Sequence, residues 1–550
     1  MRVGRLMLAP RAQEHEIFCE ALHNVGLVRA HIGAINRRLG TPQTVQELAG
    51  TLNGIAMACQ AKPVDNDISL SGRIGRMLDP QWWTRNVRRE LLRENEALEH
   101  AQGRIKKKGN CYVSNHAMQR KAERSKINRR TLAELEVVNE EGIALNLLEV
   151  SDKSVSNPKI RRAELMVRCR GFEEMASYME HEAVFLTVTA PSRFHRFAAD
   201  GKPNPKWTGA TPKDAQKHLC LLWARIRAEW KRQGISPYGF RVAEPHHDGC
   251  PHWHILLFAP LHQIGWFEPR RLIADRNDSG CGLLGIAGAY ALEDSPGEAG
   301  AMKHRFTAKR IDTTKGSATG YIAKYICKNI DGVTESGEEI GLDFASGTKA
   351  SEASQRVRTW ASTWGIRQFQ QIGGPSVTVW RELRRLAKDA QEPILQIELF
   401  EGPRAAADRS LWALFWMLQG GPEVSRAKLS LRPMYVQATV GKYGDEAQQI
   451  RGVLGFDIEQ PELELPVITR LHTWTIQRAG LAEVNASEAV WRNYRALRTG
   501  ENSTFYRAYD AIEKAREFER SGEAASTWTS VNNCTVLRAQ TRSEHDCEQS

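Results

Sequence analysis

The pattern of apolar and polar positions divides the chain into regions of different character. Up to about residue 150, good helix formers alternate with charged residues in runs such as residues 84–103, which predicts helices. The pattern changes near Ala183, because residues 183–192 form a β-branched, largely apolar run that ends at a Pro-Ser turn. We therefore expect a helical amino-terminal region followed by an α+β domain that begins near residue 180.

A helix and a hairpin are predicted after this first strand. Residues 211–234 begin with Thr-Pro, carry apolar residues at helical spacing and end at a glycine, which is typical of a helix. Residues 240–258 contain two strand-like stretches joined by the turn-rich residues 246–251, which predicts a β-hairpin. Residues 277–301 are rich in Gly, Ala and acidic residues, so we expect a loop or insertion there.

The remaining pattern predicts one more helix at residues 321–330 and a mixed region towards the carboxyl end. We expect three regions in all: a helical basic region at 1–150, the α+β domain at 180–390, and a mixed accessory domain at 400–550.

Composition and charge restrict the classes of protein to which the chain can belong. Hydrophobic residues make up 41% and charged residues 26%, and no run of about 18 apolar residues or signal peptide occurs. The ten cysteines are scattered without a CxxC pair, so we expect neither disulfides nor a zinc knuckle. The same cysteine usage favours a cytoplasmic location. The net charge of +11 favours a polyanionic partner.

Residues 104–130 concentrate positive charge in the amino-terminal region. A single acidic residue, Glu123, faces ten cations: Arg104, Lys106, Lys107, Lys108, Arg120, Lys121, Arg124, Lys126, Arg129 and Arg130. The segment is either a solvated helix face or a surface that contacts the phosphates of duplex DNA.

The second strand of the hairpin carries candidate metal ligands. Side chains alternate faces along a strand, so His252 and His254 point to the same side and Trp253 to the other. If the first strand folds back through the turn, Glu244 reaches the same face and adds a carboxylate. Two nitrogens and one oxygen leave open positions on an ion, as a catalytic metal requires.

The third ligand has alternatives in the turn itself. We expect Glu244 rather than His246 or His247, which lie in the turn and can instead orient the ligands from behind.

The predicted helix at residues 321–330 carries candidate nucleophiles. At 100° per residue, Tyr321, Lys324, Tyr325 and Lys328 lie within one arc, whereas the apolar residues occupy the opposite side. A phenol has a reference pKa of about 10 and is a poor nucleophile at neutral pH. Nearby lysines favour the phenolate, and a metal polarises a phosphodiester, so this helix predicts attack by tyrosine on phosphorus.

Three of these segments together resemble the HUH endonuclease superfamily, and specifically the phage replication gene A protein family with two tyrosines. Residues 185–192 are similar to its first motif, residues 244–258 to its metal motif, and residues 315–332 to its tyrosine motif. Residues 360–385 are also similar to the family, so the resemblance extends over roughly residues 180 to 390.

The resemblance implies an α+β fold, with an HUH endonuclease core of antiparallel sheet flanked by helices, and Mg²⁺ or Mn²⁺ as the ion. It implies that Tyr321 and Tyr325 alternate: one nicks a strand at a replication origin and keeps the 5′ phosphate, and the other later releases and rejoins the displaced strand. It also implies that the enzyme works on single-stranded origin DNA with a host helicase and DNA polymerase. The sequence contains no P-loop of the form GxxxxGK[ST], which agrees with a helicase supplied by the host.

Other readings of the same residues remain open. A two-tyrosine HUH transposase or a relaxase would use the same chemistry on different DNA ends. A non-cleaving origin-binding protein would keep the hairpin as a structural feature, and a zinc hydrolase would account for the histidines but not for the tyrosines.

Overall fold

The computed structural model describes a large part of the chain. The described residues are 10–36, 43–59, 61, 64, 68–107, 109–198, 200–273, 278–294, 297–334, 337–386, 398–437, 441–443, 448–456, 464–479, 529–531 and 534–536. Among them, no helix combines the length and the apolar character that crossing a membrane requires.

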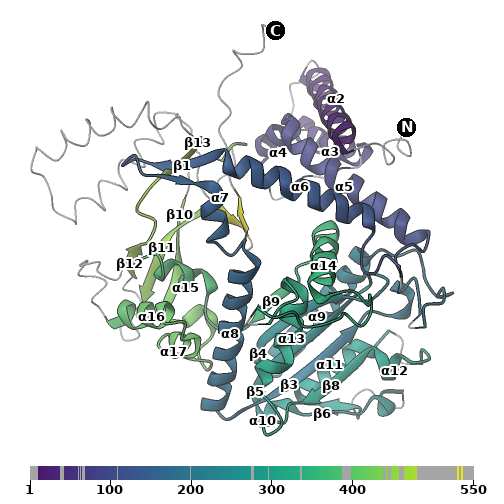
Figure 1. Ribbon diagram of the computed structural model, residues 1–550, viewed down its shortest axis with the longest axis vertical. Coiled ribbons are helices and arrows are strands. Elements are labelled where there is room, and N and C mark those ends of the chain that lie inside the picture. The colour runs from purple at the N-terminus through teal and green to yellow at the C-terminus, as the bar shows by residue number, and fades with distance from the viewer. Residues whose placement is uncertain are drawn as a thin grey trace, which may run out of the picture.

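A five-stranded antiparallel sheet, the central sheet, is built from the middle part of the chain (lower right in Figure 1). Its strands, in spatial order, are β8 (Phe306–Arg310), β3 (His181–Thr189), β5 (Pro251–Pro260), β4 (Tyr238–Pro245) and β9 (Phe369–Ile372). The predicted first strand corresponds to β3, and the predicted hairpin is formed by β4 and β5. The expectation of a mixed fold built on antiparallel sheet and helices is therefore confirmed.

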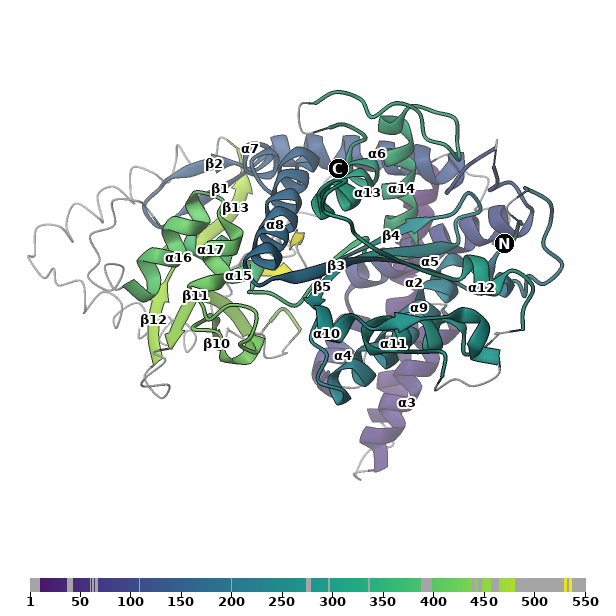
Figure 2. The same ribbon diagram turned by 90° about the horizontal axis from the view of Figure 1, so that it is seen from below.

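The two faces of the sheet are covered by different helices (Figure 2). Alternate residues of β5, among them Trp253 and Ile255, pack in one core with α9 (Pro212–Arg232) and α11 (Gly282–Leu292). The other set, Leu256 and Phe258, packs in a second core with α8 (Pro158–Tyr178) and α13 (Ala318–Ile330). The side chain of Trp253 therefore points away from the face that carries the histidines, as the strand alternation predicts.

The prediction of a loop or insertion at residues 277–301 is wrong for Gly282–Leu292, because these residues form helix α11. Its small residues permit close packing: a Cβ atom on Gly285 would lie 2.3 Å from the backbone of Gly280, and one on Gly288 would lie 2.4 Å from the ring of Phe267. The same Gly and Ala content that suggested a loop lets this buried helix approach its neighbours.

The amino-terminal region is mainly helical, as expected, with one small sheet. Its helices are α2 (Pro10–Asn36), α3 (Gln43–Ala58), α4 (Leu70–Met77), α5 (Pro80–Ala101), α6 (Asn115–Ala133) and α7 (Leu147–Asp152). Strand β1 (Leu135–Asn139) pairs with β2 (Ala144–Asn146) on one side and with β13 (Trp474–Arg478) on the other. The amino-terminal region is thus joined to a strand from the last part of the chain.

The link between α5 and α6 belongs to the core of the central sheet. Cys111, Tyr112 and Val113 are fully buried in the cluster that also contains Trp253 and the apolar residues of α9. Residues 111–117 therefore pack as part of the central domain, although they precede residue 180, where this domain was expected to begin, by some 70 residues.

The carboxyl-terminal region is mixed and packs on α8. Phe172 in α8 contacts Trp412 and Trp416 with ring centroids 6.2 and 5.3 Å apart, and contacts Phe240 of the central sheet at 5.3 Å. After Ala479, the structure describes only β14 (Thr529–Val531) and β15 (Cys534–Val536), so most of the expected accessory region after residue 480 lies outside the described residues.

The remaining elements connect or cover these parts. They are η1 (Ser192–Phe194), α10 (Leu261–Ile264), β6 (Trp266–Phe267), η2 (Pro269–Ile273), β7 (Gly280–Cys281), α12 (Ala301–His304), α14 (Ala350–Trp364), α15 (Val377–Leu383), α16 (Glu398–Asp408), α17 (Trp412–Met417), η4 (Arg426–Lys428), β10 (Leu431–Gln437), β11 (Gln448–Phe456) and β12 (Glu464–Ile468).

The close approach of α11 generates a stability prediction. We expect Gly285→Ala to destabilise the protein by about 1–3 kcal/mol, because its new Cβ meets backbone atoms that cannot rotate away. Gly54→Ala in α3 is the control, since nothing lies within 4 Å of a Cβ there and the substitution favours the helix. Thermal unfolding followed by circular dichroism measures both, and an equal midpoint for Gly285→Ala and the wild type would contradict the packing of α11.

Candidate active site

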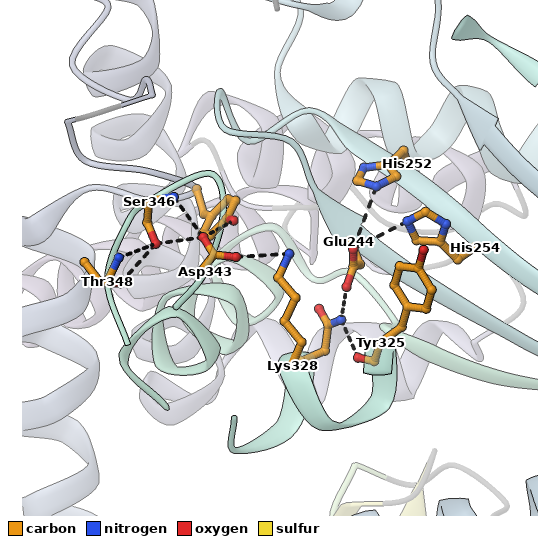
Figure 3. A network of polar contacts seen from close by, with 10 residues as sticks. Glu244, His252, His254, Tyr325, Lys328, Asp343, Ser346 and Thr348 are labelled. Atoms are coloured by element: carbon orange, nitrogen blue, oxygen red, sulfur yellow. Dashed lines mark hydrogen bonds and ion pairs between the residues drawn. The ribbon is translucent and has the colours of Figure 1, made fainter. Parts of the chain in front are cut away.

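The register of the hairpin brings the three predicted metal ligands together. Glu244 and His252 are direct partners across β4 and β5, and His254 lies two residues further along β5 on the same face. Oε2 of Glu244 lies 3.5 Å from Nε2 of His254 and 3.8 Å from Nε2 of His252. One donor atom from each residue lies within 4.8 Å of the other two (Figure 3).

The chemistry of these donors fits a divalent cation. Two donors that each lie about 2.1 Å from an ion are separated by about 3–3.4 Å, so a small adjustment of the side chains suffices. Burial and the neighbouring His246 hold the pKa of His252 well below its usual value, so its ring is neutral and has a free lone pair. Burial opposes ionisation of Glu244, but His254 and Lys328 outweigh it and lower the pKa of the carboxyl group.

Two further side chains fix the orientation of the ligands. Oγ1 of Thr187 on β3 lies 3.1 Å from Nδ1 of His254, which turns Nε2 of that ring towards Glu244. Nδ2 of Asn329 on α13 donates to Oε1 of Glu244, and also to the backbone oxygen of Tyr325 at 2.6 Å. The carboxylate is therefore tied to the same helix that carries the tyrosines.

Sequence reasoning missed Asn329, although a signal was present. It lies one helical turn after Tyr325 and two turns after Tyr321, so the helical spacing that grouped the tyrosines also reaches it.

The turn histidines lie behind the ligands. The rings of His246 and His252 are 4.0 Å apart between centroids, and His246 also contacts His195, which lies 3.3 Å from the buried carboxylate of Asp248. Among the described residues, the donor group that can surround an ion contains Glu244 rather than His246 or His247. The geometry thus favours the supporting role for the turn histidines.

Helix α13 is held against the sheet by its apolar side and by its amino-terminal end. Ile322, Ile326 and Ile330 are buried in the second core. The carboxylate of Glu173 on α8 accepts hydrogen bonds from the backbone nitrogens of Ala318 and Thr319, at 2.6 and 3.1 Å. These contacts fix how far along the sheet the tyrosines lie.

Tyr325 packs directly on the candidate metal ligands. Its ring centroid lies 4.0 Å from that of His254, and its hydroxyl end points towards the histidine (Figure 3). Burial and the charge of Glu244 raise the pKa of Tyr325, and the opposing effect of Lys328 is smaller. The side chain of Tyr325 is therefore a neutral phenol.

Tyr321 lies one turn earlier and in a different environment. Nζ of Lys309 on β8 donates to its hydroxyl oxygen at 2.9 Å. Lys309 was not among the residues that the sequence singled out, because it comes from a strand whose pairing with β3 is not visible in the sequence.

The two lysines of the tyrosine helix have separate surroundings. Lys324 is exposed, whereas Nζ of Lys328 lies 3.1 Å from Oδ1 of Asp343, a buried carboxylate (Figure 3). Burial lowers the pKa of Lys328, but Glu244 and Asp343 outweigh it and raise it, so the ammonium stays charged. The positive charge beside the candidate metal ligands therefore comes from Lys328, and the direct contact with Tyr321 comes from Lys309.

Comparison with known proteins identifies similar chains. A family model described as bacteriophage replication gene A protein matches residues 32–333, which is more than half of the chain and includes the hairpin and α13. The chain is 42% identical to the "Replication gene A protein" of Escherichia phage 186 over 405 residues, covering 73% of this chain and 55% of the relative.

Two more relatives agree with this match. The chain is 35% identical to the "Replication protein" of Haemophilus phage HP1 (strain HP1c1), covering 84% of this chain and 53% of the relative. It is 32% identical to a "Probable replication endonuclease from prophage-like region" of Shigella boydii serotype 4 (strain Sb227), covering 88% and 55%. The chain thus spans about half the length of the curated relatives it matches, and no solved structure matches it.

The geometry of the ligands predicts a direct result in metal binding. We expect Glu244→Ala to lower the affinity for Mn²⁺ by at least tenfold, because it removes the only anionic donor of the group. His247→Ala is the matched control from the same hairpin and should keep the affinity within about twofold. Titration of Mn²⁺ followed by electron paramagnetic resonance measures both variants, and the reverse ranking would assign the third ligand to His247.

Proposed function

Because this chain belongs to the bacteriophage replication gene A protein family, we propose that it is a replication endonuclease that nicks one DNA strand through a tyrosine nucleophile. The 5′ phosphate stays attached as a phosphotyrosine, and the displaced strand is later rejoined. The names of the relatives, a replication gene A protein and a probable replication endonuclease, support the replicative role and the nuclease activity.

One observation carries the proposal: the ring of Tyr325 packs on His254, whose Nε2 lies 3.5 Å from the carboxylate of Glu244. A nucleophile from α13 and three metal-binding side chains from β4 and β5 meet at one point of the sheet. A non-cleaving origin-binding protein has no need of this arrangement, and a zinc hydrolase has no need of the tyrosine.

The reaction follows from the order of bonds around phosphorus. The oxygen of Tyr325 forms a bond with phosphorus, the bond from phosphorus to the 3′ oxygen breaks, and the phenol gives up its proton as the 3′ hydroxyl gains one. Mg²⁺ or Mn²⁺ bound by Glu244, His252 and His254 would polarise the phosphate and favour the phenolate. Attack by a 3′ hydroxyl on the phosphotyrosine reverses the step, so joining needs no ATP.

The residues of this chain hold the reacting groups in position. Thr187 orients His254, Asn329 links Glu244 to the tyrosine helix, and the charged Lys328 balances the carboxylate. Lys309 holds Tyr321 at the edge of the site, where its positive charge favours a phosphate.

Two tyrosines suit a cycle in which the enzyme cuts again while it is still attached to the first 5′ end. Tyr325 lies against the metal ligands and makes the first cut, and Tyr321, one turn away, makes the second. The cycle distinguishes a rolling-circle initiator from a relaxase with one nucleophile, and the phage relatives favour it over a two-tyrosine transposase.

The rest of the proposal concerns fold, partners and location. A five-stranded antiparallel sheet with its ligand strand at the centre and helices on both faces supports an HUH endonuclease core. The partners are single-stranded DNA at a replication origin, a host helicase and a DNA polymerase, and the reaction takes place in the host cytoplasm, where phage DNA replicates. Residues 121–130 of α6, which are all exposed and mostly basic or polar, support a contact with duplex phosphates.

Phenylalanine substitutions test the nucleophiles. We expect Tyr325→Phe to reduce the covalent protein–DNA adduct at least a hundredfold, Tyr321→Phe to keep the first cleavage, and the double variant to form no adduct, because only the hydroxyl groups are removed. Labelled single-stranded oligonucleotides that tile the replication origin, incubated with Mn²⁺ and separated on a denaturing gel, measure the adduct.

The control is Tyr178→Phe, an exposed tyrosine at the end of α8 whose change should leave the adduct unchanged. An adduct that persists in the double variant, or that mass spectrometry maps to another residue, contradicts the proposed function.

A further inference from the structure

A short loop beside the active site exposes two large apolar side chains. Leu342 is 74% and Phe344 is 91% exposed, and Phe344 has the largest exposed fraction of the large apolar side chains in the described part of the chain. Asp343 between them is only 4% exposed. The backbone therefore turns one acid inward and two apolar groups outward, the reverse of the usual arrangement in water.

This arrangement is fixed by hydrogen bonds on the buried carboxylate. Oδ2 of Asp343 accepts from the hydroxyl group of Tyr112 at 2.6 Å, from the backbone nitrogen of Ser346 at 2.8 Å and from the hydroxyl group of Ser346 at 2.7 Å. The backbone of Asp343 closes the loop, since its nitrogen donates to Thr348 and its oxygen accepts from Gly347, each at 2.8 Å. Leu342 and Phe344 consequently lie exposed to solvent on a hydrogen-bonded turn.

The loop is tied to the helix that carries the nucleophiles. Oδ1 of Asp343 lies 3.1 Å from Nζ of Lys328, which follows Tyr325 by one helical turn (Figure 3). The turn that exposes Phe344 is therefore linked through Lys328 to the helix on which Tyr325 lies.

Positive charge accompanies the apolar pair. Nζ of Lys107 lies 5.2 Å from the centroid of the Phe344 ring, and the side chains of Lys106 and Lys349 are exposed. Single-stranded DNA is bound by this combination, because bases stack on aromatic rings while cations contact the adjacent phosphates. Duplex DNA does not fit, since its base faces are already stacked on one another.

We propose that Phe344, with Leu342 beside it, is the platform on which an unpaired base next to the scissile phosphate stacks. The inference rests on the proposed function and adds to it a binding site for the flank of the nicked strand. Stacking on a fixed ring holds the neighbouring phosphate in line with Tyr325 and excludes paired DNA from the site.

Single-stranded oligonucleotides that carry 2-aminopurine at successive positions test the platform, because stacking on an aromatic ring quenches this base. With the full chain and Mn²⁺, we expect quenching at one position near the cleavage site in the wild type and in Phe344→Trp. Phe344→Ala should lose the quenching and weaken single-strand affinity on the order of tenfold, with Mn²⁺ affinity unchanged.

Tyr178→Ala is the matched control, an aromatic residue that is 72% exposed. Tyr178 precedes the end of β3 at which His181 pairs with Pro260. His252 of the candidate site pairs with Thr189 at the opposite end of β3, so the control residue lies away from that site. Its single-strand affinity should equal that of the wild type.

The outcomes separate this inference from the proposed function. If Phe344→Ala binds single strands and quenches 2-aminopurine as the wild type does, the inference that a base stacks on Phe344 is wrong, even when the covalent adduct forms normally. If Phe344→Ala loses quenching and affinity while the wild type forms no adduct, the platform stands and the endonuclease function fails.

Discussion

The carboxylate of Glu244 is the interaction on which the rest of the site depends. Burial disfavours its charge, so the fold has to supply compensating groups: the imidazole of His254, the amide of Asn329 and the nearby charge of Lys328. Two of these groups come from α13, and this helix can approach the sheet only because its isoleucines fill the second core. Satisfying one buried anion therefore also fixes the distance between the tyrosines and the histidines.

The charges around Glu244 also connect the site to the amino-terminal region. Lys328 is shared between Glu244 and Asp343, and Asp343 is held by Tyr112 from the link between α5 and α6. The amino-terminal region thus contributes to the position of a charge beside the candidate metal ligands, which themselves lie on β4 and β5.

The parts of the site that the sequence predicts are those set by local periodicity. Alternation along β5 and the 100° spacing on α13 are properties of a few neighbouring residues, so they placed His252, His254 and the two tyrosines on their faces. Lys309, Asp343 and Tyr112 depend on pairings between distant segments, which no local pattern encodes. Helix α11 was missed because glycine and alanine are typical both of loops and of helices that pack closely.

The central claim is that Glu244, His252 and His254 form one metal centre against which Tyr325 packs. Crystals of the full chain soaked in Mn²⁺, measured by anomalous diffraction, test it most directly. The account predicts one strong peak about 2.1–2.2 Å from a Glu244 oxygen and from a ring nitrogen of each histidine. A peak bound elsewhere, or no peak at these residues while the protein binds Mn²⁺ in solution, would contradict it.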